Sequence, residues 1–112
     1  MELGIVRENG ILIAKPQGRL DGSNAQEFQG DLTEAISAED RGVVLDLADL
    51  SYISSAGLRV ILMTTKALQR QSAELAVCSL SDPIREVFEI SGFDKIIPVW
   101  GSQPDAIASF SG

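Results

Sequence analysis

Residues 42–58 read Gly-Val-Val-Leu-Asp-Leu-Ala-Asp-Leu-Ser-Tyr-Ile-Ser-Ser-Ala-Gly-Leu, and this stretch decides the fold. Residues 42–47 form a nearly continuous apolar run that is rich in β-branched side chains. Such runs are typical of strands that are buried on both faces of a parallel sheet. Two small hydroxyl residues, Ser54 and Ser55, then stand where a helix would begin. The stretch therefore predicts a buried parallel strand followed by a helix.

The helix that begins near Ser54 or Ser55 carries two apolar stripes. Helical spacing predicts a core face made of Leu58, Ile61, Leu62, Thr65 and Leu68. A second stripe, on a different face, is made of Val60, Met63 and Ala67. This second stripe fits either a helix packed on two sides or an exposed patch for a partner, to which Met is well suited.

The N-terminal segments predict a β-hairpin. Residues 3–7 and 11–17 are the expected strands, and residues 8–10 are the turn, because Asn-Gly between apolar runs favours a hairpin. Pro16 cannot donate a hydrogen bond to a neighbouring strand, so it indicates a bulge or an unpaired position near the strand end.

A helix is predicted after a loop at residues 18–22. Ser23 is its expected N-cap, and Gln26 completes a capping-box pattern three residues later. The helix should run for about 15 residues. Its expected core face is made of Ala25, Phe28, Leu32, Ala35 and Ile36.

The C-terminal third begins with a buried strand at residues 74–79. In the helix that follows, Asp82 is the expected cap, Pro83 suits the first position and Gly92 suits the C-terminal end. A short strand at residues 96–99 and a short helix at residues 104–110 complete the chain. The apolar contacts of these two helices are expected from Ile84, Val87, Phe88, Ile90, Ala106, Ile107 and Phe110.

Together these segments predict a single α/β domain over residues 1–112, in the order β-β-α-β-α-β-α-β-α. The central sheet is expected to be mixed, with about five strands and about four helices, because its first connection is a hairpin and the later ones are crossovers. A chain of 112 residues that is 45% hydrophobic can build one such core.

Composition excludes several kinds of function. The chain has no histidine, which removes the commonest general base and most transition-metal sites. Cys78 is the only cysteine, so neither an internal disulfide nor a thiolate metal cluster is possible. Because it sits in an apolar run, we expect a core residue, with a reactive thiol as the alternative. We expect neither a metal nor a cofactor. A net charge of −7 disfavours binding to nucleic acid. No apolar run approaches a membrane span, and the N-terminus does not resemble a signal peptide, so we expect a cytoplasmic protein.

Ser54 and Ser55 can be interpreted in two ways. One hydroxyl at a helix start is ordinarily a cap, and capping needs only one of them. A helix N-terminus also suits a phosphate, and phosphorylation there would add about −1.5 to −2 charge. Gly57 is expected to leave backbone uncovered, so that another surface could approach closely. These features predict a phosphorylation switch in a protein that works by binding a partner.

Three segments, in the right order, resemble the STAS domain family. Residues 43–58 are similar to its signature, residues 18–21 to its Gly-x-Leu-Asp motif, and residues 87–97 to its third helix and last strand. The resemblance is closest to the bacterial anti-sigma factor antagonists. It implies a protein that is a monomer when free and binds an anti-sigma factor with serine kinase activity, which then phosphorylates it. A PP2C-type phosphatase would remove the phosphate.

The family pattern places the phosphorylated serine at Ser55, with Ser54 as the second choice. Many members have Asp where Ser54 stands, and this chain departs from them there. Asp21 matches a family acidic position and would contact the partner or orient the kinase, although an ordinary Asx turn explains it equally well. The expected partner-binding residues are Asp21, Ser23, Tyr52, Ser54, Ala56, Gly57, Arg59, Val60 and Met63.

Three other functions compete with this interpretation. A serine nucleophile would lack both Gly-x-Ser-x-Gly and a histidine, leaving only Lys15, Lys66 or Lys95 as a base. A phospho-aspartate receiver centred on Asp46 would lack its acidic pair, so Asp46 is expected to orient the following loop. A STAS scaffold or sensory module in secretion, motility or a stress complex is the main alternative.

Overall fold

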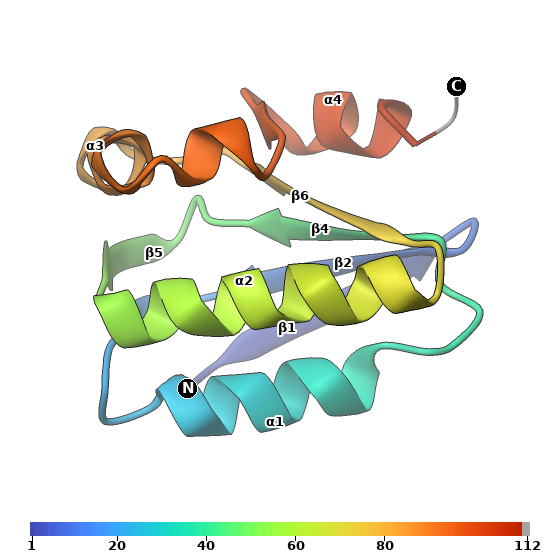
Figure 1. Cartoon of the computed structure of the whole chain (residues 1–112), viewed down its shortest axis with the longest axis horizontal. Helices are drawn as coiled ribbons and strands as arrows, with labels where there is room; N and C mark the ends of the chain where they lie inside the picture. The colour runs from blue at the N-terminus through green and yellow to red at the C-terminus, as the bar shows by residue number, and fades with distance from the viewer. Residues whose placement is uncertain (111–112) are drawn as a thin grey trace.

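The protein's structure, a computed structural model that describes residues 1–110, is built on a five-stranded mixed sheet (Figure 1). The strand order is β1-β2-β4-β6-β7, with β1 antiparallel to β2 and the other neighbours parallel. Their bounds are β1 Leu3–Glu8, β2 Ile11–Pro16, β4 Gly42–Asp46, β6 Glu74–Cys78 and β7 Val99–Trp100. The predicted mixed sheet and its hairpin start are confirmed.

Within residues 1–110, four α-helices cover the sheet unequally. They are α1 Ala25–Ala35, α2 Ser55–Arg70, α3 Asp82–Ser91 and α4 Gln103–Ala108, with a 3-10 turn, η1, at Phe93–Lys95. The first three pack against one face of the sheet, which presents Leu12, Val43 and Leu75. The short α4 covers part of the other face, against Ile13, Val44 and Cys78. The larger core therefore lies under α1, α2 and α3.

A second, two-stranded sheet was not predicted. Residues 18–22 were expected to be a loop, but Gly18–Leu20 forms β3, which pairs in parallel with β5 at Leu50–Ile53. Each strand is too short to show a period-two pattern, and the pairing joins segments that are distant in sequence. The first crossover therefore contains β3 as well as α1.

The predicted start of α1 was wrong. Asn24, not Ser23, occupies the N-cap position, and its side chain makes no capping hydrogen bond. The Asn24 amide instead accepts from the Asp21 N–H at 2.9 Å and donates to the Arg19 carbonyl at 2.8 Å. The helix has 11 residues and ends at Ala35.

The C-terminal boundaries also differ from expectation. Ser81 occupies the N-cap of α3 and Asp82 is its first residue, whereas Gly92 ends it in the predicted left-handed conformation with φ 77°. Ile90, expected in the core, is 80% exposed. The last strand is Val99–Trp100, because η1 and the turn that follows it occupy the chain before it.

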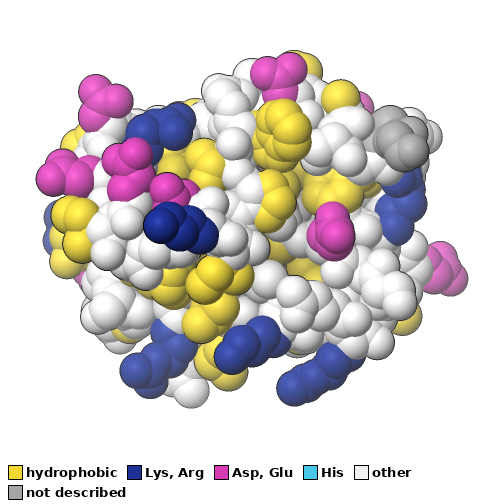
Figure 2. Space-filling view, turned by 45° about the horizontal axis from the view of Figure 1, so that its top comes forward, with side chains coloured by type: hydrophobic (Ala, Val, Ile, Leu, Met, Phe, Trp, Pro, Cys, Tyr) yellow, Lys and Arg dark blue, Asp and Glu magenta, His cyan; other side chains and the backbone are white. Residues whose placement is uncertain are grey.

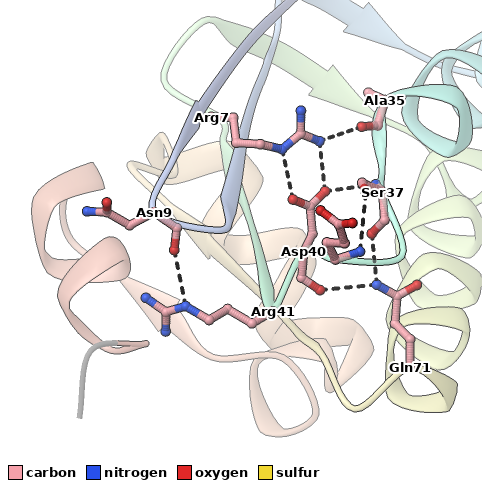
Figure 3. Close-up of polar contacts among 8 residues, drawn as sticks. Arg7, Asn9, Ala35, Ser37, Asp40, Arg41 and Gln71 are labelled. Atoms are coloured by element: carbon pink, nitrogen blue, oxygen red, sulfur yellow. Dashed lines mark hydrogen bonds and ion pairs between the residues drawn. The ribbon is translucent and has the colours of Figure 1, made fainter.

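One polar cluster joins the sheet edge to the helical layer (Figure 3). Arg7 on β1 makes two hydrogen bonds of 2.8 Å to the Asp40 carboxylate and one of 2.7 Å to the Ala35 carbonyl. The Ser37 N–H donates to the same carboxylate at 2.8 Å. Gln71, at the end of α2, donates to the Ser37 and Asp40 carbonyls. The cluster therefore fixes the loop between α1 and β4.

Candidate functional site

The second sheet brings two distant segments together. β3 leads into α1 and β5 leads into α2, and the register pairs Arg19 with Tyr52. The Ser54 N–H donates to the Leu20 carbonyl at 2.9 Å, which continues the pairing to the start of α2. Residues before α1 and residues before α2 therefore meet on one surface.

Ser54 and Ser55 have different roles in the structure. Ser54 is the N-cap of α2, in extended conformation, and its hydroxyl accepts from the Gly57 N–H at 3.4 Å. Ser55 is the first helical residue and is exposed. Within residues 1–110, its hydroxyl has no hydrogen-bond partner, and the first turn of α2 contains no acidic residue. Capping therefore accounts for Ser54 and leaves the Ser55 hydroxyl available.

The prediction that Gly57 leaves its backbone uncovered is wrong. It is buried, and a Cβ atom there would lie 2.7 Å from Leu20 Cγ and 3.0 Å from Ile53 Cγ1. The glycine is needed because α2 packs closely on the β3–β5 pair. Val60 is also buried, with 5% exposure. Neither residue is available for the direct partner contact that was predicted.

Gly57→Ala is expected to lower the free energy of unfolding by about 1 kcal/mol. Overpacking costs about 1–3 kcal/mol, which exceeds the ~1 kcal/mol that Ala gains over Gly within a helix. Gly30→Ala in α1 is the matched control, since nothing lies within 4 Å of its Cβ position, and should stabilise by up to about 1 kcal/mol. Urea unfolding measures both; stabilisation at both positions would contradict close packing at Gly57.

Asp21 is held in an Asx turn. Its carboxylate accepts from the Ser23 N–H at 3.0 Å and from the Ser23 hydroxyl at 2.6 Å. These bonds, the Ser23 hydroxyl above all, and the nearby Arg19 hold the pKa of Asp21 below its ordinary value. The ionised carboxylate lies 3.8 Å from Arg19 Nε. The Asx turn is confirmed, and a partner contact by Asp21 stays a prediction.

Arg19 is a site residue that sequence reasoning missed. Its guanidinium lies 4.2 Å from the centroid of the Tyr52 ring, and Tyr52 is 41% exposed. Only the register of the unpredicted strand pair places these two residues together. Arg59, which is exposed, follows Ser55 by four residues and so lies on the same side of α2. We call the Ser55 surface the set Arg19, Asp21, Ser23, Tyr52, Ser54, Ser55, Ala56 and Arg59.

Met63 lies apart from this surface. It is two turns further along α2, about 12 Å from Ser55 at 1.5 Å per residue. Its side chain, 49% exposed, lines a groove between α1 and α2. The predicted set of contact residues therefore divides between two places on the molecule.

Asp46 and Cys78 belong to the structural core. The Asp46 carboxylate accepts from the Ala48 N–H at 3.0 Å and from the Gln103 amide at 2.8 Å, which confirms that it orients the loop after β4. Cys78 is fully buried, and burial raises the pKa of its thiol to about 11. Over residues 1–110, no cluster of three potential metal ligands occurs. None of the helices in these residues has the length and hydrophobicity of a membrane-spanning segment.

The chain matches a known family over most of its length. The profile of the STAS domain matches residues 3–106, and the chain belongs to this family. BtrV of Bordetella bronchiseptica, assigned as an anti-sigma factor antagonist, is 46% identical over 110 residues, covering 98% of this chain and 95% of BtrV. The anti-sigma F factor antagonist of Paenibacillus polymyxa is 29% identical over 108 residues, covering 96% and 92%.

Solved structures share the fold. An anti-sigma factor antagonist from Thermotoga maritima superposes with a TM-score of 0.91 at 19% identity, covering 98% of this chain and 95% of that one. The antagonist SpoIIAA in its unphosphorylated form gives 0.84 at 18% identity, covering 99% and 97%. SpoIIAA of Bacillus in its phosphorylated form gives 0.73 at 17% identity, covering 96% and 98%. The predicted STAS-like fold is therefore confirmed.

Proposed function

We propose that this chain is an anti-sigma factor antagonist whose binding to an anti-sigma factor is switched by phosphorylation of Ser55. The names of its relatives support the antagonist role. The single observation that supports the switch is that the two serines at the start of α2 have different roles. Ser54 caps the helix, and Ser55 presents an exposed hydroxyl beside it.

The fold would tolerate a phosphate on Ser55. The first N–H groups of a helix have no partner within the helix, and the positive end of the dipole favours an anion. The first turn of α2 holds no acidic residue that would repel the phosphate. Arg59, four residues later, adds a positive charge on the same side. The modification would therefore change the surface without unfolding the helix.

A partner would not tolerate the same phosphate. The Ser55 surface offers Tyr52 and two arginines, which are the residue types that most often dominate binding energy at interfaces. A partner that docks on arginines presents acidic groups, and a phosphate placed among those groups would repel them. We expect the partner to be an anti-sigma factor with serine kinase activity, and a PP2C-type phosphatase to reset the switch.

Incubation with the cognate anti-sigma factor kinase and ATP tests the acceptor. Mass spectrometry should find one phosphate, on Ser55, and Ser55→Ala should abolish it because no hydroxyl remains at that position. Ser54→Ala is the matched control: it removes the cap and should still be phosphorylated. Modification of Ser54 in the wild-type chain, or of a serine outside α2, would contradict the assignment.

A further inference from the structure

A groove of about 530 Å³ runs between α1 and α2. The two helices lie side by side and begin at the same end of the molecule (Figure 1). Ile36, Met63 and Ala67 give the groove an apolar surface, and Lys66 and Arg70 stand in its lining. Met63 and Ala67 are exposed although they are apolar, so the groove is open to another molecule.

The charge of this region is opposite to that of the chain. The chain has 16 acidic and nine basic residues, but α2 contains three basic residues and no acidic one. No residue that lines the groove is acidic. Asp31 and Glu34 of α1 line a different hollow, beside β1. In Figure 2, the charged side chains along the lower edge are all basic, while acidic ones gather at the upper left.

Lys66 and Arg70 form a matched pair for an acidic ligand. They are four residues apart and therefore share one side of α2. Both are exposed, and within residues 1–110 neither side chain is in an ion pair. An apolar surface flanked by two such cations complements a ligand that has an apolar stripe and acidic flanks.

We propose that the groove between α1 and α2 binds an acidic amphipathic helix of a partner protein. A channel between two parallel helices suits a third helix that lays its apolar stripe into it. Met63 to Arg70 spans about 10 Å of α2, enough for about two turns of the incoming helix. Along α2 the groove extends from Met63, about 12 Å from Ser55, to Arg70, about 22 Å from it, so it is a second surface beyond the proposed phosphorylation site.

Two synthetic peptides test this proposal on the full chain. The first has 14 residues, leucines at helical spacing and glutamates on both flanks; the second has lysine in place of every glutamate. In a titration of the isotope-labelled protein followed by NMR, the acidic peptide should shift the amide signals of Thr33 and of residues 63–71. Raised salt should weaken the binding of this peptide. The lysine peptide should leave these amides unchanged.

Charge reversal supplies the matched variants. Lys66→Glu with Arg70→Glu should weaken the acidic peptide at least about tenfold. Arg85→Glu with Lys95→Glu makes the same change in net charge outside the groove and should leave the affinity within about twofold. Equal binding of both peptides, shifts centred on Ser55, or no shift at all would overturn the proposal. Dodecanoate, a small amphiphile with one carboxylate, is a third probe in the same titration. If dodecanoate shifts the groove amides and the acidic peptide does not, the groove is a site for small amphiphiles and the proposal is overturned.

Discussion

Ser55→Asp should weaken binding to the anti-sigma factor on the order of 100-fold, equivalent to about 2.7 kcal/mol. The aspartate places a fixed negative charge on the Ser55 surface, where the proposed partner contributes acidic groups to Arg19 and Arg59. Like charges brought together at an interface cost several kcal/mol. Isothermal titration calorimetry with the cognate anti-sigma factor measures the loss.

The same substitution should leave the fold intact or stabilise it. A negative charge in the first turn interacts favourably with the helix dipole, by about 0.3–1 kcal/mol, and Ser55 is exposed. Loss of binding together with an unchanged or raised melting temperature separates a switch from simple unfolding. A lowered melting temperature would show that the loss of binding comes from damage to α2.

Three variants make the result specific to this position. Ser55→Ala should bind like the wild type, because it adds no charge to the Ser55 surface. Ser54→Asp preserves a good N-cap and should keep most of the affinity, because the capping carboxylate turns toward the Gly57 N–H and not outward to the partner. Ser109→Asp adds the same charge at an exposed position after α4; it removes the hydroxyl that donates to the Ala106 carbonyl but should leave the affinity unchanged. If Ser54→Asp lost as much affinity as Ser55→Asp, the choice between the two serines would fail.

The order of elements could be predicted because each boundary has a local chemical cause. Asn9 and Gly10 both have positive φ, 51° and 80°, as the hairpin turn requires. Gly92 ends α3 for the same reason. The buried run at residues 42–47 becomes the central strand β4, paired on both sides. These features depend on the residue and its immediate neighbours.

The candidate site was predicted only in part, because its geometry depends on contacts between distant segments. The family pattern predicts Ser55 as the acceptor, which stays a prediction, but only the pairing of β3 with β5 places Arg19 over Tyr52. The same pairing places Leu20 over α2 and gives Gly57 its packing role. Ser23 stands in a sequence pattern that is typical of a cap, but its hydroxyl donates to the Asp21 carboxylate. Local propensity could not show which of these tertiary contacts would form.

Arg7→Ala is expected to lower the free energy of unfolding at pH 7, and by more than an exposed control substitution does. The Asp40 side chain is only 2% exposed, and the variant would leave its charge buried without the bidentate partner shown in Figure 3. Removing one partner of an ion pair is costly when the remaining charge is buried, and the 42% exposure of the Arg7 side chain means that water screens part of this loss. Arg85→Ala, at an exposed position on α3, is the control and should change stability by less than about 0.5 kcal/mol.

The pH dependence of that loss tests its cause. The Arg7 guanidinium holds the pKa of Asp40 below its ordinary value, with a smaller contribution from the Ser37 N–H. The stability that comes from this lowered pKa is therefore fully present above the unfolded-state pKa of about 3.9 and disappears as the pH falls through the folded-state pKa. In Arg7→Ala the main cause of the lowering is gone, and burial, which raises the pKa of Asp40, is opposed only by Ser37. Urea unfolding at pH 7, 5, 4 and 3 should thus show that the free energies of unfolding of the wild type and Arg7→Ala approach each other as the pH falls. A difference that stays constant would mean that Arg7 stabilises the loop between α1 and β4 by packing and not by its charge.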